Sequence, residues 1–317
     1  MDEKNISNED ISNTETNNDE QNVATSTDDY EPKYKNIVLS GGSVGGISHI
    51  GVLKKLLDEK LIHLKKIATI AATSAGSLIA ILVVLGYSIE EIWNFILSLD
   101  MKKMVAPDFF MFLKKCGFDT GHIIYGLFEE IIAKTTGIKH INFRQLYELT
   151  HTHIIIVGSC LTTKEAVYYD HINTPNFKVS MAIRISIGMP GFFTPVIIDN
   201  KKYIDGAVLN NYPMNLFENK LEETIGVIIA GDYDTDYEYP EQYIQAVINL
   251  FLYHYFSETS KKYENNTIYV KRFADINIFD FDVSNEIKIK LYELGIASAQ
   301  EFIDKLKQKP VIAVEEF

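Results

Sequence analysis

The chain has 317 residues, of which 46% are hydrophobic and 23% are charged, and its formal net charge is −13. This acidic balance argues against a nucleic-acid-binding protein, because a phosphate-binding surface needs clustered Lys and Arg, and it weakens the case for electrostatic docking on anionic membranes. The two cysteines form no motif, and the N-terminus lacks a basic, apolar leader. We therefore expect a cytoplasmic protein without disulfides or a signal peptide.

The first 33 residues differ in composition from the rest of the chain. They contain ten acidic residues, two lysines and almost no aliphatic side chains. Such a segment cannot bury enough apolar surface to order itself, so we predict a disordered acidic tail over 1–33. A phosphorylated or partner-binding tail is the alternative to a merely solvated one. The remainder, 34–317, is expected to form one domain with a helical extension over 241–307.

Strand and helix patterns alternate along this domain. Strands are predicted at 35–40, from 67 towards Ser74, and at 153–159, 166–170, 202–204 and 225–230. Helices are predicted at 47–59, 77–85, 88–97, 121–134, 143–149, 241–255 and 284–306, with a Ser88–Glu91 capping box and Ser284 as an N-cap. Residues 104–118 are aromatic and irregular. The alternation predicts an α/β fold in which a mostly parallel sheet is covered on both faces.

One segment has the length of a transmembrane helix. Residues 67–87 are 21 residues without a charge. However, Thr69, Thr73 and Ser74 interrupt the run, and its first residues are β-branched at alternate positions. We therefore interpret it as a buried strand followed by a buried helix, with no transmembrane span. A membrane-anchored protein remains the weaker alternative.

The sequence Ala72-Thr-Ser-Ala-Gly76 is the first segment with catalytic potential. A strand that turns sharply into a helix at a serine between small residues has the geometry of a nucleophile elbow. Small neighbours allow the two backbones to approach, and the helix N-terminus favours the negative charge that develops in acyl transfer. Ala72 stands where the usual pattern has glycine. Ser74 is the candidate nucleophile, supported by Ala72 and Gly76.

A glycine-rich loop between the first strand and its helix can present backbone N–H groups to an anion. It lacks the G-x-G-x-x-G spacing of a dinucleotide site and the lysine of a phosphate loop. An oxyanion hole needs only backbone amides and close approach, and this interpretation is left by elimination. The candidate donors lie at Gly41, Gly42, Ser43, Val44, Gly45 and Gly46.

The third segment, Asp205-Gly206-Ala207, follows a predicted strand directly. A carboxylate at a strand end, followed by glycine, can reach into a cleft at the carboxyl edge of the sheet. Taken alone, the segment favours an ordinary Asp-Gly turn over a catalytic carboxylate.

Together these segments resemble patatin-like phospholipases. Leu39–Leu53 is similar to the family's opening G-G-G-x-[RK]-G loop and helix, and residues 73–76 stand where its G-x-S-x-G lies. Asp205 to Ala207 match its D-G-[AG], and Ser186–Pro195 resembles its S-x-x-x-P-x-x-F-x-P segment. The matches keep the family's order from about Asn36 to Pro213, which is more than half of the chain.

The resemblance implies a three-layer α/β/α fold and a Ser–Asp dyad. Asp205 would take the proton of Ser74, which attacks a lipid ester while amides of Gly42, Ser43 and their neighbours hold the oxyanion. Water would then release the fatty acid, without a metal or an organic cofactor. The expected partners are ester lipids, met through peripheral membrane contact.

Two positions depart from the family's loop, since Ser43 replaces its third glycine and Gly45 its basic residue. The alternative hypothesis is therefore a catalytically weak or inactive member that binds lipid or a protein partner.

Several residues permit other interpretations. His254 is the only histidine after Asp205 and is expected to pack rather than to complete a triad, and His49 is expected to be structural. The acidic run 232–236 fails the EF-hand template and predicts a solvated loop. The aromatic run 109–113, next to two lysines, is compatible with core packing and with a lid or an interfacial anchor.

Overall fold

The computed structural model describes residues 30–230, 243, 246–247, 250, 261–271 and 281–308. The compact unit that begins at Glu31 contains every element named below. The predicted acidic tail lies outside the described residues up to position 29. The acidic run 232–236 and His254 lie outside them as well, and the predicted helix at 241–255 is described only at isolated positions.

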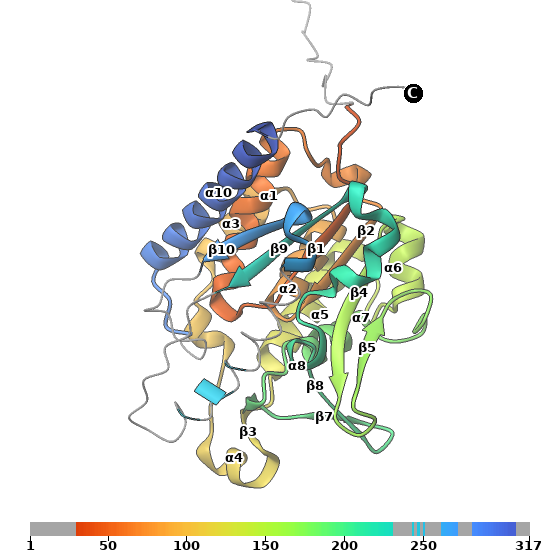
Figure 1. Cartoon of the computed structure of the whole chain (residues 1–317). Helices are drawn as coiled ribbons and strands as arrows, with labels where there is room; N and C mark the ends of the chain where they lie inside the picture. The colour runs from red at the N-terminus through yellow and green to blue at the C-terminus, as the bar shows by residue number, and fades with distance from the viewer. Residues whose placement is uncertain are drawn as a thin grey trace, which may run out of the picture. The chain divides into compact units, whose positions relative to one another are not determined.

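The described residues form an eight-stranded sheet in the order β10-β9-β1-β2-β4-β8-β7, with β5 also paired to β4. The pairs from β10 to β4 are parallel, whereas β5 and β8 pair with β4 in the antiparallel sense, as β7 does with β8 (Figure 1). The strands are β1 (Asn36–Leu39), β2 (Thr69–Thr73), β4 (His153–Cys160), β5 (Glu165–Tyr169), β7 (Val196–Ile198), β8 (Lys201–Asp205), β9 (Thr224–Ala230) and β10 (Thr267–Lys271). This arrangement confirms the predicted α/β fold, although the sequence did not reveal β7 or β10.

Both faces of the sheet are buried, and alternate side chains serve two different cores. In β1, Ile37 and Leu39 belong to the larger core, whereas Val38 belongs to the smaller one. Helices cover the larger core. Among the described residues, the smaller core is closed by the segment η4 (Pro213–Glu223) and by Tyr263. Burial on both faces explains why these strands are continuous apolar runs.

Most of the predicted helices are present. The helices are α1 (Ser48–Asp58), α2 (Ala75–Val84), α3 (Ile89–Ser98), α4 (Phe109–Lys115), α5 (His122–Thr136), α6 (Phe143–Thr150), α7 (Val179–Ser186), α8 (Ala207–Asn210) and α10 (Asn285–Gln308). The capping box between Ser88 and Glu91 is formed, and Ser284 Oγ accepts the Ile287 N–H. The sequence missed α7, and the region expected to be irregular contains α4 and the short strand β3 (Gly117–Asp119).

Helix α10 packs directly against α1, far from it in the sequence (Figure 1). Two glycines permit the close approach. A Cβ at Gly51 would lie 2.0 Å from the Tyr292 carbonyl oxygen, and one at Gly295 would lie 2.1 Å from that of Ser48. The C-terminal helix therefore holds α1 in place, directly behind the glycine-rich loop.

The uncharged run 67–87 does not form one helix. It divides into β2 and α2, which meet at Ser74, as the sequence predicted. No helix in the part of the chain that the structure describes is both long and apolar enough to cross a membrane.

Candidate active site

Ser74 occupies the junction between β2 and α2 in a strained backbone conformation, with φ 51° and ψ −125°. A positive φ is uncommon for a residue with a side chain and persists only where its surroundings enforce it. The Ser74 N–H donates to Ser186 Oγ at 2.8 Å, and the Ser74 carbonyl accepts the Ser77 hydroxyl at 2.6 Å. These contacts fix the turn, which has the geometry of the predicted nucleophile elbow.

The small residues around Ser74 permit this turn. A Cβ at Gly76 would lie 2.6 Å from the Leu39 carbonyl oxygen and 2.7 Å from that of Ser40, so α2 can approach β1 only with glycine there. Ala72 is fully buried in β2, in register with Leu39. Its methyl group therefore packs within the core, and the departure from glycine at this position is accommodated.

Asp205 reaches Ser74 because of how two strands meet on β4. Thr73, the last residue of β2, is in register with Val157, and Asp205, the last residue of β8, is in register with Gly158. Strand β5 pairs with one edge of β4, so β2 and β8 share the other edge. They run along this edge in opposite directions, towards each other. Their C-terminal ends therefore converge, and the residues that follow them project from one place.

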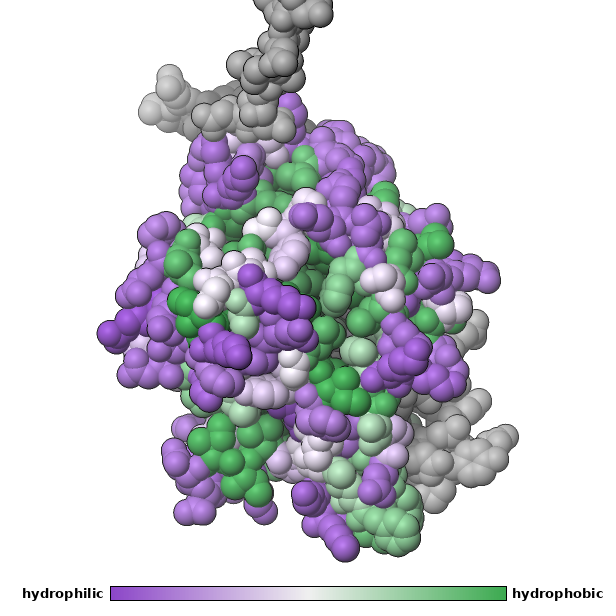
Figure 2. All heavy atoms as spheres, turned by 180° about the vertical axis from the view of Figure 1, so that it is seen from behind, coloured by the Kyte–Doolittle hydropathy of each residue, from purple (hydrophilic) through white to green (hydrophobic). Residues whose placement is uncertain are grey.

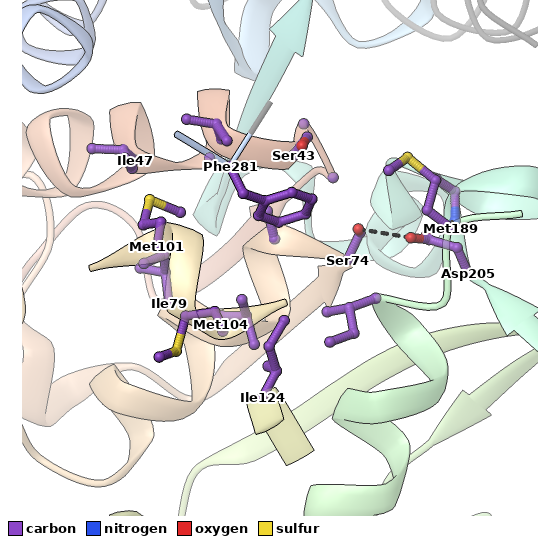
Figure 3. A pocket seen from close by; sticks show the side chains of 18 of the residues that line it. Ser43, Ile47, Ser74, Ile79, Met101, Met104, Ile124, Met189, Asp205 and Phe281 are labelled. Atoms are coloured by element: carbon purple, nitrogen blue, oxygen red, sulfur yellow. Dashed lines mark hydrogen bonds between the residues drawn. The ribbon is translucent and has the colours of Figure 1, made fainter. Parts of the chain in front are cut away.

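The two side chains are in direct contact at this point. Ser74 Oγ donates to Asp205 Oδ2 at 2.8 Å, as the dashed line in Figure 3 shows. The other carboxylate oxygen accepts the Ala207 N–H at 2.8 Å, and the Asp205 side chain is almost fully buried. Burial disfavours the charged carboxylate and raises the pKa of Asp205 to about 7, against the opposing effects of the Ala207 and Ser74 hydrogen bonds and the Arg184 charge.

Arg184, which sequence reasoning missed, lies buried close to this carboxylate. Its guanidinium donates to the carbonyl oxygens of Thr120 at 2.7 Å and Thr194 at 2.8 Å, while Nη1 has no hydrogen-bond partner. Burial lowers the pKa of Arg184 to about 10, which leaves it charged at neutral pH. The only sign in the sequence that Arg184 is buried was its position among the apolar residues of Val179–Ser186.

The glycine-rich loop, which follows β1, also lies close to Ser74. A Cβ at Gly41 would lie 2.9 Å from Ser74 Cβ and 2.5 Å from Asn211 Oδ1. The Gly41 N–H donates to that oxygen at 2.8 Å, so this amide is already engaged by a residue that sequence reasoning missed. A second contact fixes the end of the loop, where a Cβ at Gly46 would lie 2.6 Å from that of Ala75.

The remaining loop positions differ in their access to Ser74. Gly42, Ser43 and Val44 line the cavity beside it, whereas Gly45 is buried and is absent from the lining. Ser43 has a φ of 51°, a value that a glycine would adopt without strain. The family's third glycine thus corresponds to a position with left-handed backbone in this chain.

A cavity of about 540 Å³ opens at Ser74, a volume typical of small-ligand sites. Its walls come from α2, α3, α5 and the segment η3 (Met101–Met104), and they are almost entirely apolar. Figure 3 shows Ile79, Met101, Met104 and Ile124 on one side of Ser74, with Asp205 on the other. A hydrogen-bonded polar pair is therefore placed at one end of an apolar chamber, next to Gly206 and Ala207 at the start of α8.

His49 does not contribute to this arrangement. It is fully buried outside the cavity lining, its Nε2 donates to the Ser40 carbonyl oxygen at 2.8 Å, and burial lowers its pKa to about 4. It is therefore neutral and structural, in agreement with the sequence-based expectation. In the described part of the chain, His, Cys, Asp and Glu side chains form no group of three that could hold a metal ion.

A serine hydrogen-bonded to a group that can accept its proton is the arrangement that covalent acyl transfer requires, and the apolar chamber fits a substrate with a hydrocarbon chain. The sequence model of the patatin-like phospholipase family matches residues 37–217, more than half of the chain. The chain therefore belongs to the patatin-like phospholipase family.

Three relatives are similar to the chain in sequence. The chain is 30% identical to the uncharacterized protein R571 of Acanthamoeba polyphaga mimivirus, across 87% of this chain and 96% of that protein. It is 28% identical to the uncharacterized protein YqhO of Bacillus subtilis, across 84% of this chain and 97% of YqhO. Identity is also 28% to the probable lipid hydrolase 463L of Invertebrate iridescent virus 6, across 59% of this chain and 64% of that protein.

Solved structures show a similar fold. VipD from Legionella pneumophila superposes with a TM-score of 0.56 at 17% identity, over 86% of this chain and 67% of VipD. Full-length ExoU from Pseudomonas aeruginosa, solved in complex with SpcU, gives a TM-score of 0.51 at 16% identity over 88% of this chain. The chain spans about half the length of ExoU, at 54%. At these identities the likeness concerns the fold alone.

Proposed function

We propose that this protein is a phospholipase A-type lipid acyl hydrolase that uses Ser74 and Asp205 as a dyad. The observation that carries the proposal is the 2.8 Å hydrogen bond from Ser74 Oγ to Asp205 Oδ2 at the end of the apolar cavity. Membership of a phospholipase family and similarity to a probable lipid hydrolase support ester lipids as the substrate class.

In the first half-reaction, ionised Asp205 accepts the Ser74 hydroxyl proton while Oγ attacks the ester carbonyl carbon. The carbonyl oxygen becomes an oxyanion, and Asp205 returns the proton to the leaving alkoxide as the C–O bond breaks. In the second half-reaction Asp205 deprotonates a water molecule, which attacks the acyl-serine carbonyl carbon, and it returns this proton to Ser74 Oγ as the bond to the acyl group breaks and the fatty acid leaves. The reaction needs no metal or cofactor, because one carboxylate transfers every proton.

The glycine loop and α2 are proposed to stabilise the oxyanion. Gly42 and Ser43 line the cavity beside Ser74, and their amides are the donors we assign. Gly41 is excluded from this role, because its N–H binds Asn211. The N-terminus of α2, which begins directly after Ser74, adds the favourable end of a helix dipole.

Fatty-acid release from mixed phospholipid vesicles tests the proposal. We expect release by the wild-type chain, and a loss of at least about 10³-fold in Ser74→Ala and Asp205→Asn, because both residues act in one proton transfer. Ser98→Ala and Asp199→Asn are matched controls at exposed positions and should retain activity.

Other outcomes would change the assignment. If the folded wild type and both variants all release no fatty acid, the alternative of an inactive protein that binds lipid or a partner is favoured. The departures at Ser43 and Gly45 would then be the first positions to examine. Activity that survives in Ser74→Ala would mean that another residue is the nucleophile.

A further inference from the structure

We propose that α4 is a membrane-docking helix that places the catalytic cavity on an anionic bilayer. The inference rests on the proposed lipid substrate and identifies the surface that meets it. Helix α4 is the lowest element in Figure 1, beyond β3. Figure 2 shows the molecule from behind, turned about the vertical axis, so that α4 stays at the bottom. The lower end of the molecule in this view has exposed hydrophobic side chains.

The outward face of α4 is apolar and exposed. Phe109, Phe110 and Leu113 expose 63%, 72% and 66% of their surfaces. These positions lie on one face of a helix, because residues three and four apart are neighbours. One edge of this face is anchored, since Phe112 stacks on Phe118 at 4.5 Å and the Phe109 ring lies 6.5 Å from the same ring. The helix is thus held at this edge while it presents its apolar face to the outside.

Two lysines at the end of α4 complement the charge of an anionic lipid surface. Lys114 and Lys115 are exposed, and neither has an acidic partner within the described part of the chain. Lys102 and Lys103, in the preceding turn, are instead paired with Asp282 at 2.7 Å and with Asp100 at 2.9 Å. Apolar side chains beside lysines are the pattern of helices that lie in the membrane interface.

The chain on both sides of α4 lines or borders the cavity. Met104, just before the helix, forms part of the lining, and β3, just after it, pairs with the strand β6 (Gly191–Phe193), of which Phe193 lines the cavity. The Asp119 carboxylate accepts the N–H groups of Ala106 and Gly121 and so ties the two sides together. A bilayer that receives α4 therefore lies next to the cavity walls, where acyl chains can pass into the protein.

A second copy of the chain fits this surface less well. A stable protein interface takes about 20–30 residues from each partner, whereas α4 has seven residues and three exposed apolar side chains. Insertion into a bilayer needs only a few apolar side chains, with electrostatic attraction in support.

Vesicle sedimentation with the full chain in the Ser74→Ala background tests the proposal without lipid turnover. The vesicles are phosphatidylcholine, with or without one third phosphatidylglycerol. We expect Phe110→Ser/Leu113→Ser to weaken binding to both compositions by at least about tenfold, because two large side chains no longer insert. Lys114→Glu/Lys115→Glu should weaken binding at least about tenfold on the anionic vesicles only, because each lysine contributes roughly fivefold there.

Matched controls change the same residue types elsewhere. Leu149→Ser/Ile172→Ser and Lys139→Glu/Lys164→Glu alter exposed residues away from α4 and should bind like the parent. In the catalytically competent chain, the α4 variants should lose activity on vesicles yet hydrolyse soluble p-nitrophenyl butyrate normally. Unchanged vesicle binding by both α4 variants would overturn the docking role, as would a dimer that only the apolar variant abolishes. Inactivity of the wild type on both substrates, with intact vesicle binding, would refute the proposed function instead.

Discussion

Gly188 lies beside both Arg184 and Asp205: a Cβ on this glycine would lie 3.3 Å from Arg184 Nη1 and 3.3 Å from the Asp205 backbone nitrogen. The unpartnered Nη1 is thus buried beside the backbone of the proposed base. A buried positive charge favours the ionised carboxylate and partly offsets the effect of desolvation on the Asp205 pKa. We infer that Arg184 keeps Asp205 ionisable near neutral pH.

The pH dependence of catalysis follows from this relationship. With the pKa of Asp205 raised to about 7 by burial, kcat/KM should fall about tenfold per pH unit in acid below that value. In Arg184→Gln the midpoint should move upward by about one unit, since the opposing positive charge is gone. A pH–rate profile on soluble p-nitrophenyl butyrate measures both. A purely structural role for Arg184 would lower the whole profile without moving its midpoint.

The same carboxyl affects stability. In the unfolded chain it ionises near its ordinary pKa of 3.8, whereas burial raises its folded pKa to about 7. Between these values the folded state binds the extra proton, so this group's contribution to stability decreases as the pH rises and is lowest above about 7.

Asp205→Asn removes this penalty. Its free energy of unfolding, relative to wild type, should rise by on the order of 3–4 kcal/mol between pH 4 and pH 8. Urea unfolding at several pH values measures the difference. The exposed Asp199→Asn should show no such rise, and a flat difference for Asp205→Asn would contradict the raised pKa.

Asn211 should act on the chemical step by positioning the glycine loop. Without the acceptor for the Gly41 N–H, Asn211→Ala allows the loop amides to move, and loss of one oxyanion donor costs about 10²–10³ in rate. We expect kcat to fall about 10²-fold while KM stays within a few fold, because the apolar residues of the cavity wall are unchanged. Steady-state kinetics separates the two constants. A rise in KM alone would instead assign Asn211 to substrate binding.

Met104 should limit acyl-chain length, since it lines the cavity opposite the dyad in Figure 3. Met104→Trp fills part of this space, so hydrolysis of long-chain p-nitrophenyl esters should fall about tenfold relative to the butyrate, because about 0.8 kcal/mol is lost for each methylene that is excluded. Met181→Trp, the same exchange outside the lining, serves as the control. Equal losses on short and long esters would show that the cavity does not hold the acyl chain.

The sequence predicted the parts of the site that local chemistry determines. A serine between small residues at a strand–helix junction has a recognisable pattern, and the Asp205-Gly206-Ala207 segment lies at a strand end. Gly206 shows the physical reason for that pattern, because a Cβ there would lie 2.3 Å from the Val157 carbonyl oxygen. The order of the motifs shared with the family predicted that Ser74 and Asp205 act together. The register of β2 and β8 on β4 explains why the two residues meet.

The parts that depend on packing were not predictable in the same way. Arg184 belongs to a helix that the sequence did not reveal, and its proximity to Asp205 depends on how α7 lies against β4. Asn211 carries no local signal for its bond to Gly41, 170 residues away. The cavity likewise exists only once α2, α3 and α5 have assembled.

Labelling with a fluorophosphonate tests the central claim most directly, because the reagent reacts with an activated serine whatever the natural lipid is. We expect one adduct per chain at pH 8, located on Ser74 by peptide mass spectrometry, absent in Ser74→Ala and strongly reduced in Asp205→Asn. Ser98→Ala should label like the wild type. A folded chain that remains unlabelled, or an adduct on any other residue, would contradict the assignment of Ser74 and Asp205 as the catalytic pair.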